Sequence, residues 1–381
     1  MRTAIFGGSF DPVHAEHVRI VRAAREKLGL DRIFVVPAYS APHKDDSTAS
    51  PEDRLGMCRI AFSSESGCEV SPFEIRSGGI SYTYRTAAHF RALYPEDELF
   101  LLTGADMLGS FDTWREPEKI LSCARLAVCG REGQETTLSG ERKRFFRRFG
   151  TDFVSVGYTG RNVSSSRIRV LCAFGEDTDG LLLPDVREYI DARALYSVPH
   201  IREAMRYLKP ARARHSLRVA FLAAELARKN HVRERDAVQA AALHDAAKYL
   251  PAESPELSGF RLEEPVPAPV LHQYTGAYLA EHTFGVTDPD ILNAIRYHTT
   301  GRPGMSRLEE IIYLADMLEE GRDFPGVEKL RACLSKESLD ETMYRCLKHQ
   351  TGYLGNGEEK VCPLTAEAYE YYRKLHKAEN K

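Results

Sequence analysis

The chain has 381 residues, of which 43% are hydrophobic and 28% are charged. These values are ordinary for globular proteins, so they exclude extended disorder and fibrous repeats, and the length favours two domains. The 52 basic residues face 55 acidic ones, and the resulting net charge of −3 argues against a nucleic-acid partner bound through bulk charge. A basic run at residues 142–148 is interpreted as a solvated helix face.

The sequence gives no sign of membrane insertion or secretion. No stretch reaches the ~18 apolar residues that a membrane span needs, and the N-terminus does not resemble a secretory signal. The eight cysteines are scattered and form no Cys-x-x-Cys pair, which is typical of reduced thiols. We therefore expect a cytoplasmic protein without a membrane partner, and we leave open whether it forms a homo-oligomer.

The first half of the chain alternates short β-rich runs with amphipathic segments. The β-rich runs lie at residues 3–7, 32–37, 69–75, 98–103, 126–129 and 153–156. Segments with helical spacing lie between them, among them 18–28, 51–63 and 83–94. This alternation predicts an α/β fold with a Rossmann-like parallel sheet covered on both faces. In such sheets ligands bind beyond the carboxyl ends of the strands.

After Tyr196 the strand pattern ends and helical spacing dominates. Helices are predicted at 200–208, 212–229, 234–249, 268–284, 289–298, 306–320 and 364–377. Nine of the 13 histidines also lie in this second half. We therefore expect two domains, an α/β domain over residues 1–196 and an all-α domain over residues 197–381.

A glycine-rich loop follows the first β-rich run and leads into a predicted helix. It begins with Gly7, Gly8, Ser9 and Phe10 and continues through Asp11-Pro12-Val13 to His14 and His17. Glycines let backbone N–H groups approach an anion, and a helix N-terminus adds its dipole. The loop therefore predicts a phosphate site in which both histidines face one phosphate chain, although a tight turn with two surface histidines has the same composition.

Several later motifs of this half also lie where strands end or helices begin. They are Ala41-Pro42-His43-Lys44, Ser81-Tyr82-Thr83, Gly104-Ala105-Asp106-Met107, Trp114 and Ser164-Ser165-Ser166-Arg167-Ile168-Arg169. Together with the glycine loop, this ordered set resembles the bacterial nicotinate-mononucleotide adenylyltransferases, over residues 1–196. The resemblance implies adenylyl transfer from ATP to nicotinate mononucleotide with Mg²⁺, which gives deamido-NAD and pyrophosphate.

The same resemblance implies roles for individual residues. The ATP phosphates would contact the loop residues 7–10 and His14, His17, Lys44, Ser165, Ser166 and Arg169. The pyridine nucleotide would contact Thr83, Gly104, Asp106, Trp114 and Arg131. The chain departs from the family pattern at Glu16, where a glycine is usual, and at Arg85, where an acid is usual. Because Glu16 adds negative charge near ATP, a slow transferase or a nucleotide sensor is a second interpretation.

The second half places histidines and aspartates on separate predicted helices. They are His215, the adjacent pair His244 and Asp245, His272, His298 and Asp316. Taken singly, each histidine is compatible with an ordinary core position. Jointly, they suggest a metal site, because buried charges are costly unless they are paired or bound to a metal. Imidazole and carboxylate without cysteine suit Fe, Mn or Co.

This pattern resembles the HD superfamily of metal-dependent phosphohydrolases. Residues 294–305, 311–316 and 322–331 narrow the resemblance to YqeK-type symmetrical diadenosine tetraphosphatases, over about residues 200–375. It implies an Fe²⁺/Fe³⁺ or other divalent site, with one or two ions, that cuts diadenosine tetraphosphate into two ADP. Asp245 and Lys248 would be catalytic, and nucleotide contacts would come from His215, Lys248, His272, His298, Thr299, Arg302, Asp316 and Arg322. Another nucleotide substrate for this half is the alternative.

Overall fold

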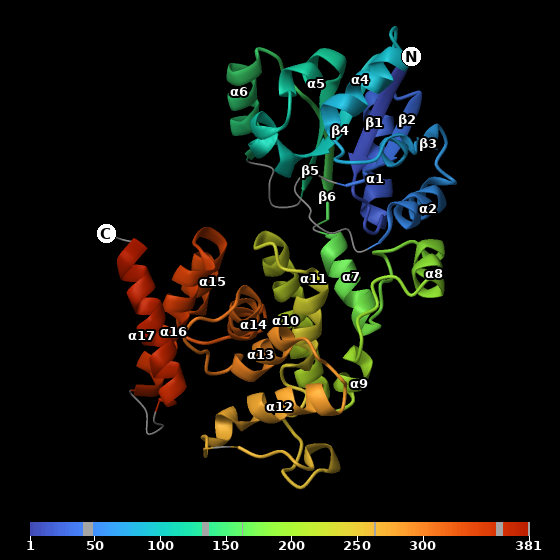
Figure 1. Cartoon of the computed structure of the whole chain (residues 1–381). Coiled ribbons are helices and arrows are strands. Elements are labelled where there is room, and N and C mark those ends of the chain that lie inside the picture. Colours follow the sequence, from blue (N-terminus) through green and yellow to red (C-terminus); the bar gives the residue numbers. More distant parts are fainter. Residues whose placement is uncertain (41–48, 132–136, 162, 263, 356–360, 380–381) are drawn as a thin grey trace. The chain divides into compact units, whose positions relative to one another are not determined.

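The computed structural model describes residues 1–40, 49–131, 137–161, 163–262, 264–355 and 361–379. The chain forms two compact units, which Figure 1 colours from blue to green and from yellow to red. The first unit comprises Met1–Cys172 and Asp177–Tyr196, and the second comprises Ala173–Glu176 and Ser197–Lys381. The main division between them thus falls after Tyr196, while residues 173–176 group with the second unit.

The first unit is built on a parallel six-stranded sheet with the strand order β3-β2-β1-β4-β5-β6. The strands are β1 (Arg2–Gly8), β2 (Arg32–Pro37), β3 (Cys68–Val70), β4 (Glu98–Gly104), β5 (Arg125–Arg131) and β6 (Val154–Gly160). β1 pairs with β2 on one side and with β4 on the other, so the strand order reverses at β1 and β4. Ligands of such sheets bind at this reversal. The glycine loop after β1 and Gly104 at the end of β4 flank it.

Helices cover both faces of this sheet (Figure 1). They are α1 (Ala15–Leu28), α2 (Pro51–Phe62), α3 (Phe73–Ser77), α4 (Thr83–Leu93), η1 (Ala105–Thr113), α5 (Pro117–Cys123), α6 (Thr137–Phe149), α7 (Ser165–Phe174) and α8 (Pro184–Ala192). Alternate strand residues enter separate cores: Phe6 packs in one and Ile5 in the other. The α/β fold is therefore confirmed. The strand expected at 69–75 is too long, because helix α3 begins at Phe73.

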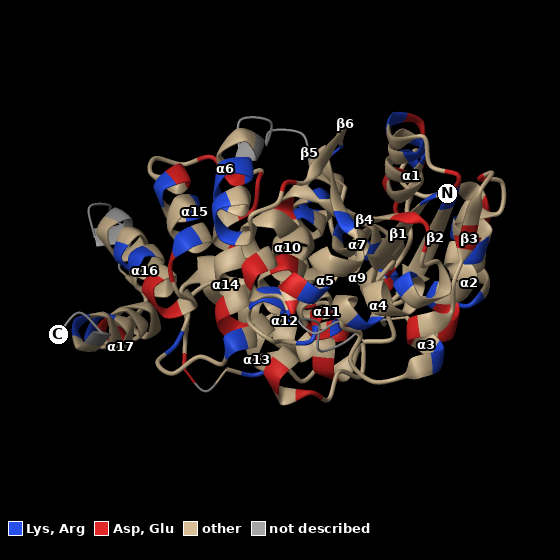
Figure 2. Ribbon diagram, turned by 90° about the horizontal axis from the view of Figure 1, so that it is seen from above, with Lys and Arg blue, Asp and Glu red and all other residues tan. Residues whose placement is uncertain are grey.

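The basic run of the first unit lies on helix α6. Figure 2 shows its Lys and Arg residues near acidic residues. Arg144 pairs with Glu141 at 2.9 Å and Arg148 pairs with Glu118 at 3.1 Å, and both arginine side chains are more than 40% exposed. The prediction of a solvated helix face is confirmed.

The regular elements of the second unit are all helices in its described residues, where no strand occurs. Its elements are α9 (Ile201–Met205), α10 (Pro210–Lys229), α11 (Glu234–Leu243), η2 (Pro255–Leu257), η3 (Ala268–Val270), α12 (Leu271–His282), α13 (Pro289–Tyr297), α14 (Arg307–Leu318), α15 (Val327–Lys336), α16 (Leu339–Gly355) and α17 (Pro363–Glu379). The all-α prediction is confirmed, but α15 and α16 were not expected from the apolar spacing. Across the described part of the chain, no helix combines the length and the apolar character that crossing a membrane requires.

One helix boundary matters for the chemistry of the second unit. Helix α11 ends at Leu243, and residues 244–249 form turns instead of continuing the helix predicted to 249. His244 and Asp245 therefore lie at a helix end and not within a helix. His298 similarly caps the C-terminus of α13.

Candidate active sites

The glycine loop of the first unit brings its two histidines together. The rings of His14 and His17 stack with centroids 3.7 Å apart, and the His14 backbone N–H donates to His17 Nδ1 at 3.1 Å. The Phe10 ring packs against this pair, with its centroid 5.0 Å from the centroid of the His17 ring. A Cβ at Gly8 would lie 3.1 Å from the Phe10 ring, so any side chain here would require that ring to shift. Because His14 is only 5% exposed, the alternative of two surface histidines is wrong for this residue.

The start of helix α7 contacts the same loop from far along the sequence. The Ser165 hydroxyl donates to the carbonyl of Pro12 at 3.1 Å. The Arg169 guanidinium donates to the carbonyl of Asp11 and, at 2.9 Å, to the hydroxyl of Ser166. The distant arginine and the glycine loop therefore meet, as expected. In this arrangement Arg169 is buried and holds the loop itself.

Arg54 belongs to none of the sequence motifs, yet its side chain holds several backbone segments of this site together. It is completely buried, and its guanidinium donates to the carbonyls of Ser9 at 2.8 Å, Ala38 at 2.5 Å and Tyr39 at 2.8 Å. Burial lowers the pKa of Arg54, and the nearby Asp11 carboxylate opposes this effect. Arg54 thus joins the glycine loop to the segment after β2. Its position on the apolar face of the predicted helix 51–63 was the available signal.

The unusual Glu16 is anchored on strand β6. Its carboxylate accepts hydrogen bonds from the Tyr158 hydroxyl at 2.6 Å and from the Arg161 backbone N–H at 3.1 Å, and it pairs with Arg19 at 3.1 Å. Burial and the Glu16 charge raise the pKa of Tyr158 to about 12. A Cβ at Gly160 would lie 2.7 Å from the Glu16 carboxylate, so the glycine at this position leaves room for the Glu16 side chain.

The residues expected on the pyridine-nucleotide side lie near the end of β4 and the start of α4. The Asp106 carboxylate folds over Gly104, where a Cβ would lie only 2.3 Å from it. Thr83 is the first residue of α4. Trp114 packs on Phe111 with ring centroids 5.1 Å apart, which gives the tryptophan a structural role in the core. Lys44 and the side chain of Arg131 lie outside the described residues.

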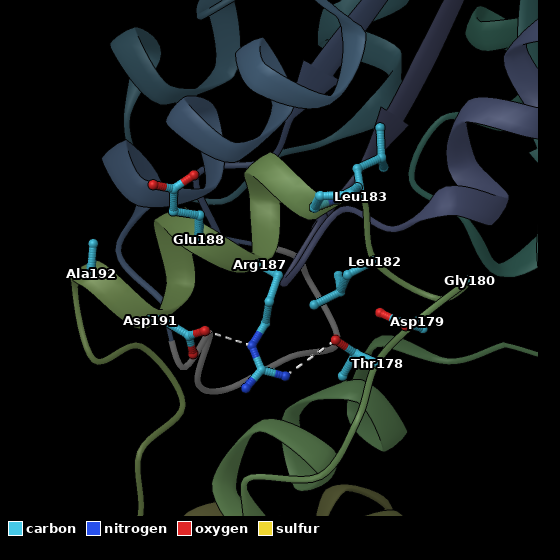
Figure 3. Close-up of a pocket in the computed structure, with 10 residues that line it drawn as sticks. Thr178, Asp179, Gly180, Leu182, Leu183, Arg187, Glu188, Asp191 and Ala192 are labelled. Atoms are coloured by element: carbon cyan, nitrogen blue, oxygen red, sulfur yellow. Dashed lines mark hydrogen bonds and ion pairs between the residues drawn. The ribbon is translucent and has the colours of Figure 1, made fainter.

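A hollow elsewhere in the first unit does not coincide with either predicted site. It is lined by residues between Thr178 and Ala192, on α8 and on the segment that precedes it. Arg187 crosses it and is bonded to Asp191 at 2.8 Å and to Thr178 at 3.2 Å (Figure 3). Its lining includes none of the predicted site residues, so shape alone does not locate the chemistry.

The second unit assembles the predicted metal ligands from five helices or helix ends. His215 lies on α10, His244 and Asp245 follow α11, His272 lies on α12, His298 caps α13 and Asp316 lies on α14. One group of potential ligand atoms comprises His215, His244 and Asp316, and its atoms all lie within 4.8 Å of one another. His215 Nε2 is 2.9 Å from Asp316 Oδ1, and His244 Nε2 is 3.8 Å from the same oxygen.

A second group shares His244 and adds Asp245 and His298. The two oxygens of the Asp245 carboxylate lie near different histidines. Oδ2 lies 3.4 Å from His244 Nε2, whereas Oδ1 lies 3.3 Å from His272 Nε2 and 3.7 Å from His298 Nε2. Asp245 therefore directs one oxygen toward the shared His244 and the other toward His272 and His298.

The hydrogen bonding of this cluster fits a bound cation. His244 Nε2 and Asp245 Oδ1 are buried and have no hydrogen-bond partner among the described residues. A buried polar atom without a partner is costly, and a metal ion would satisfy both atoms. The His244 Nδ1 atom lies 2.7 Å from the carbonyl of Ala241, which fixes the ring so that Nε2 faces the cluster.

Electrostatics also prepare these side chains to act as ligands. Burial would raise the pKa of Asp245, but His244 and His298 outweigh it and lower that pKa strongly. Burial, together with His298 and Lys248, lowers the pKa of His272 to about 3. The carboxylate is therefore ionised and the imidazole neutral at pH 7, which are the forms that bind a metal.

Three of the residues predicted to contact the nucleotide lie next to the cluster. Lys248 Nζ lies 2.9 Å from His272 Nε2 and 3.7 Å from Asp245 Oδ1. Arg322 donates to the backbone carbonyl of Asp316 at 2.7 Å and contacts its carboxylate. The Thr299 hydroxyl lies 3.2 Å from His272 Nε2. Each of these three residues therefore contacts a ligand of the cluster.

Arg302 is placed differently. Its guanidinium makes two bonds, at 2.7 Å and 2.6 Å, to the buried carboxylate of Glu309. Its predicted nucleotide contact would therefore have to use Nη1, because Nε and Nη2 are bonded to Glu309.

Comparison with known proteins assigns each half to the kind of domain that the sequence analysis predicted for it. The cytidylyltransferase-like family model matches residues 5–171, and the HD domain model matches residues 212–321. A protein of Mycoplasma genitalium named "Probable nicotinate-nucleotide adenylyltransferase/Ap4A hydrolase" is 32% identical over 325 residues, which cover 84% of this chain and 87% of that protein. The chain belongs to this nicotinate-nucleotide adenylyltransferase/Ap4A hydrolase family.

Two further relatives are similar to this family member. A protein of Mycoplasma pneumoniae with the same name is 31% identical over 320 residues, which cover 84% of this chain and 88% of that protein. A crystal structure from Clostridium acetobutylicum, described as a "predicted HD superfamily hydrolase involved in NAD metabolism", is 32% identical. It covers 46% of this chain and 96% of its own, with a TM-score of 0.41.

In this member of the adenylyltransferase/Ap4A hydrolase family, Glu319 orients His215, a candidate metal ligand, and the sequence analysis did not single it out for that role. Glu319 is 1% exposed and lies 3.0 Å from His215 Nδ1. It also accepts hydrogen bonds from Arg218 Nε at 2.6 Å and from the Gly321 N–H at 2.5 Å. Burial would raise the pKa of Glu319, but these partners lower it to about 2. An acidic residue three positions after Asp316 was the only signal in the sequence.

Proposed function

We propose that this chain is a bifunctional enzyme with one nucleotide chemistry in each unit. The first unit joins ATP and nicotinate mononucleotide to form deamido-NAD and pyrophosphate. The second unit hydrolyses diadenosine tetraphosphate to two ADP. The observation that carries the proposal is the relationship, over 84% of this chain, to a protein named for both activities. A cytoplasmic location fits these intracellular nucleotides.

The loop geometry of the first unit supports adenylyl transfer without a covalent enzyme intermediate. A phosphate oxygen of nicotinate mononucleotide attacks the α-phosphorus of ATP, and the bond to the departing pyrophosphate breaks. The stacked His14 and His17 rings and the N-terminus of α1 would stabilise the negative charge. Mg²⁺, when bound, supplies further charge neutralisation and would be held chiefly by the ATP phosphates. Ser165 and Arg169 keep the loop in place.

The anchoring of Glu16 favours turnover over a purely sensory role. Its carboxylate is engaged by Tyr158, Arg161 and Arg19, so its charge is partly compensated on β6. A test compares wild-type protein with Glu16→Gly and Glu16→Gln for pyrophosphate release. Similar rates in all three would support catalysis with this residue. ATP binding without any turnover in the wild type would instead support the sensor.

The ligand cluster of the second unit supports metal-dependent phosphoanhydride hydrolysis. His215, His244, Asp245, His272, His298 and Asp316 would hold one or two metal ions. A divalent ion of the Fe, Mn or Co type, when bound, supplies a Lewis acid and an activated water. Lys248 and Arg322 would neutralise phosphate oxygens. A symmetrical cut adds the hydroxyl of water to one central phosphorus and its proton to the departing ADP.

A product assay distinguishes this reaction from its alternatives. Metal-free protein is loaded separately with Fe²⁺, Mn²⁺ or Co²⁺ and incubated with diadenosine tetraphosphate. ADP as the sole nucleotide product supports the proposal, whereas AMP with ATP shows an asymmetrical cut. Loss of ADP production in His244→Ala and Asp245→Ala assigns the reaction to this cluster. Hydrolysis of another nucleotide but not of this one would support the alternative substrate.

A further inference from the structure

An exposed tyrosine lies beside the ligand cluster of the second unit and has no part in the chemistry described so far. Tyr249 is 42% exposed and directly follows Lys248 in the turns after α11. The Lys209 ammonium lies 4.5 Å from the centre of its ring. The Tyr249 side chain also interacts with the guanidinium of Arg212. An exposed aromatic ring thus lies between two cations.

Arg212 connects this tyrosine directly to the cluster. Its Nη1 atom lies 2.9 Å from Asp245 Oδ2, and its side chain is 25% exposed. Lys248 approaches the other oxygen of the same carboxylate, at 3.7 Å. A continuous path of contacts therefore runs from Tyr249 through Arg212 to the Asp245 carboxylate of the second ligand group.

The cations around the cluster fall into two sets. Arg212 and Lys248 contact Asp245, whereas Arg322 contacts Asp316. A phosphate chain bound at the cluster would meet positive charge near Asp245 and near Asp316. A substrate with a nucleoside at each end then needs a place for each base. Tyr249 lies next to Arg212, which belongs to the set of cations that contacts Asp245.

We propose that Tyr249 and Lys209 form a stacking site for one nucleobase of a dinucleoside polyphosphate, and that Arg212 binds the phosphates next to that base. This inference rests on the proposed hydrolase function of the second unit and adds the substrate class that the site selects. A tyrosine ring can stack on any base, and the neighbouring cation strengthens the stack on an electron-rich face. The site therefore selects for the presence of a second base and only weakly for its identity.

The test compares Tyr249→Ala and Tyr249→Phe with the wild type, on the full chain loaded with the most active metal. The substrates are diadenosine tetraphosphate and adenosine 5′-tetraphosphate, which carries one base. Stacking contributions correspond to an increase of about tenfold in KM for the two-base substrate in Tyr249→Ala. We expect an unchanged kcat, a smaller KM change for the one-base substrate, and near-wild-type behaviour in Tyr249→Phe.

Tyr371→Ala is the matched control, because Tyr371 is 37% exposed in the same unit and packs against Tyr372. It should leave KM unchanged for both substrates. An unchanged KM for diadenosine tetraphosphate in Tyr249→Ala would overturn the proposal, and so would an equal increase for both substrates. If the wild type makes no ADP, the hydrolase function itself fails. If the wild type makes ADP and Tyr249→Ala behaves like it, only the stacking site fails.

Discussion

Replacing Glu319 by glutamine is a sharp test of how the metal site is held. The carboxylate lies 3.0 Å from His215 Nδ1 and accepts bonds from Arg218 and the Gly321 N–H. A glutamine of the same shape keeps one acceptor oxygen but turns an NH₂ group toward donors. It also removes the negative charge that favours a proton on Nδ1 of His215 and leaves Nε2 for the metal.

The expected magnitude follows from these contacts. Loss of a partner that orients a metal-bound histidine typically lowers metal affinity by about 10–100-fold. This range corresponds to roughly 1.4–2.8 kcal/mol of binding free energy. The folded protein should also lose about 2 kcal/mol of stability, because a hydrogen bond to a charged group contributes about 1.5–3 kcal/mol. The two effects are of similar size, so the metal titration and the unfolding measurement should both report the substitution.

Glu320→Gln provides the matched control, since Glu320 is the adjacent acid and is exposed. Metal-free samples of the wild type and both variants are titrated with Co²⁺, and binding is followed by its visible absorption. We expect weaker binding and a lower Tm for Glu319→Gln and wild-type values for Glu320→Gln. Equal Co²⁺ affinity in all three proteins would refute the role assigned to Glu319.

Three other predictions concern stability and metal removal. Arg54→Ala leaves the carbonyls of Ala38 and Tyr39 unpaired in a buried site, so urea unfolding should show a loss of about 3 kcal/mol. Burial raises the pKa of Glu74, which bonds Thr86. Its ionised form is therefore disfavoured in the folded chain, and Glu74→Gln should raise Tm at pH 7, with a gain that shrinks as the pH falls through this raised pKa. An undiminished gain at low pH would contradict this reasoning. Chelation followed by return of Mg²⁺ alone should abolish ADP production but restore deamido-NAD synthesis, and parallel loss of both would show a shared metal requirement.

The sequence was most informative where short-range patterns carry the information. The alternation of β-rich and amphipathic segments predicted the α/β unit, and the glycine loop could be placed after β1 because its glycines adjoin a buried run. The candidate ligands from His215 to Asp316 could be predicted to lie together because imidazole and carboxylate are unusual on apolar helices. Helices α15 and α16 were missed although their buried apolar residues recur at helical spacing, at Val327, Leu330 and Cys333 in α15 and at Leu339, Met343 and Leu347 in α16.

Boundaries and partners were less accessible to pattern alone. The α11 helix ends before His244, although the apolar residues continue to Ala247. The prediction placed this end too late because apolar spacing does not show where the backbone begins to turn. Phe73 begins a short helix where β propensity had suggested the end of a strand. In both cases contacts with the rest of the unit override the local preference.

By itself, the sequence determined the two fold classes and the chemical types of side chain available to each site. Only the tertiary structure showed that Arg54 binds three loop carbonyls, that Glu319 holds His215, that Glu16 is bound to Tyr158 and that Arg302 is paired with Glu309. These contacts join residues that are often far apart in the chain or lack any periodic signature. Their partners are fixed when helices and strands pack, and local spacing along the chain carries no record of that packing.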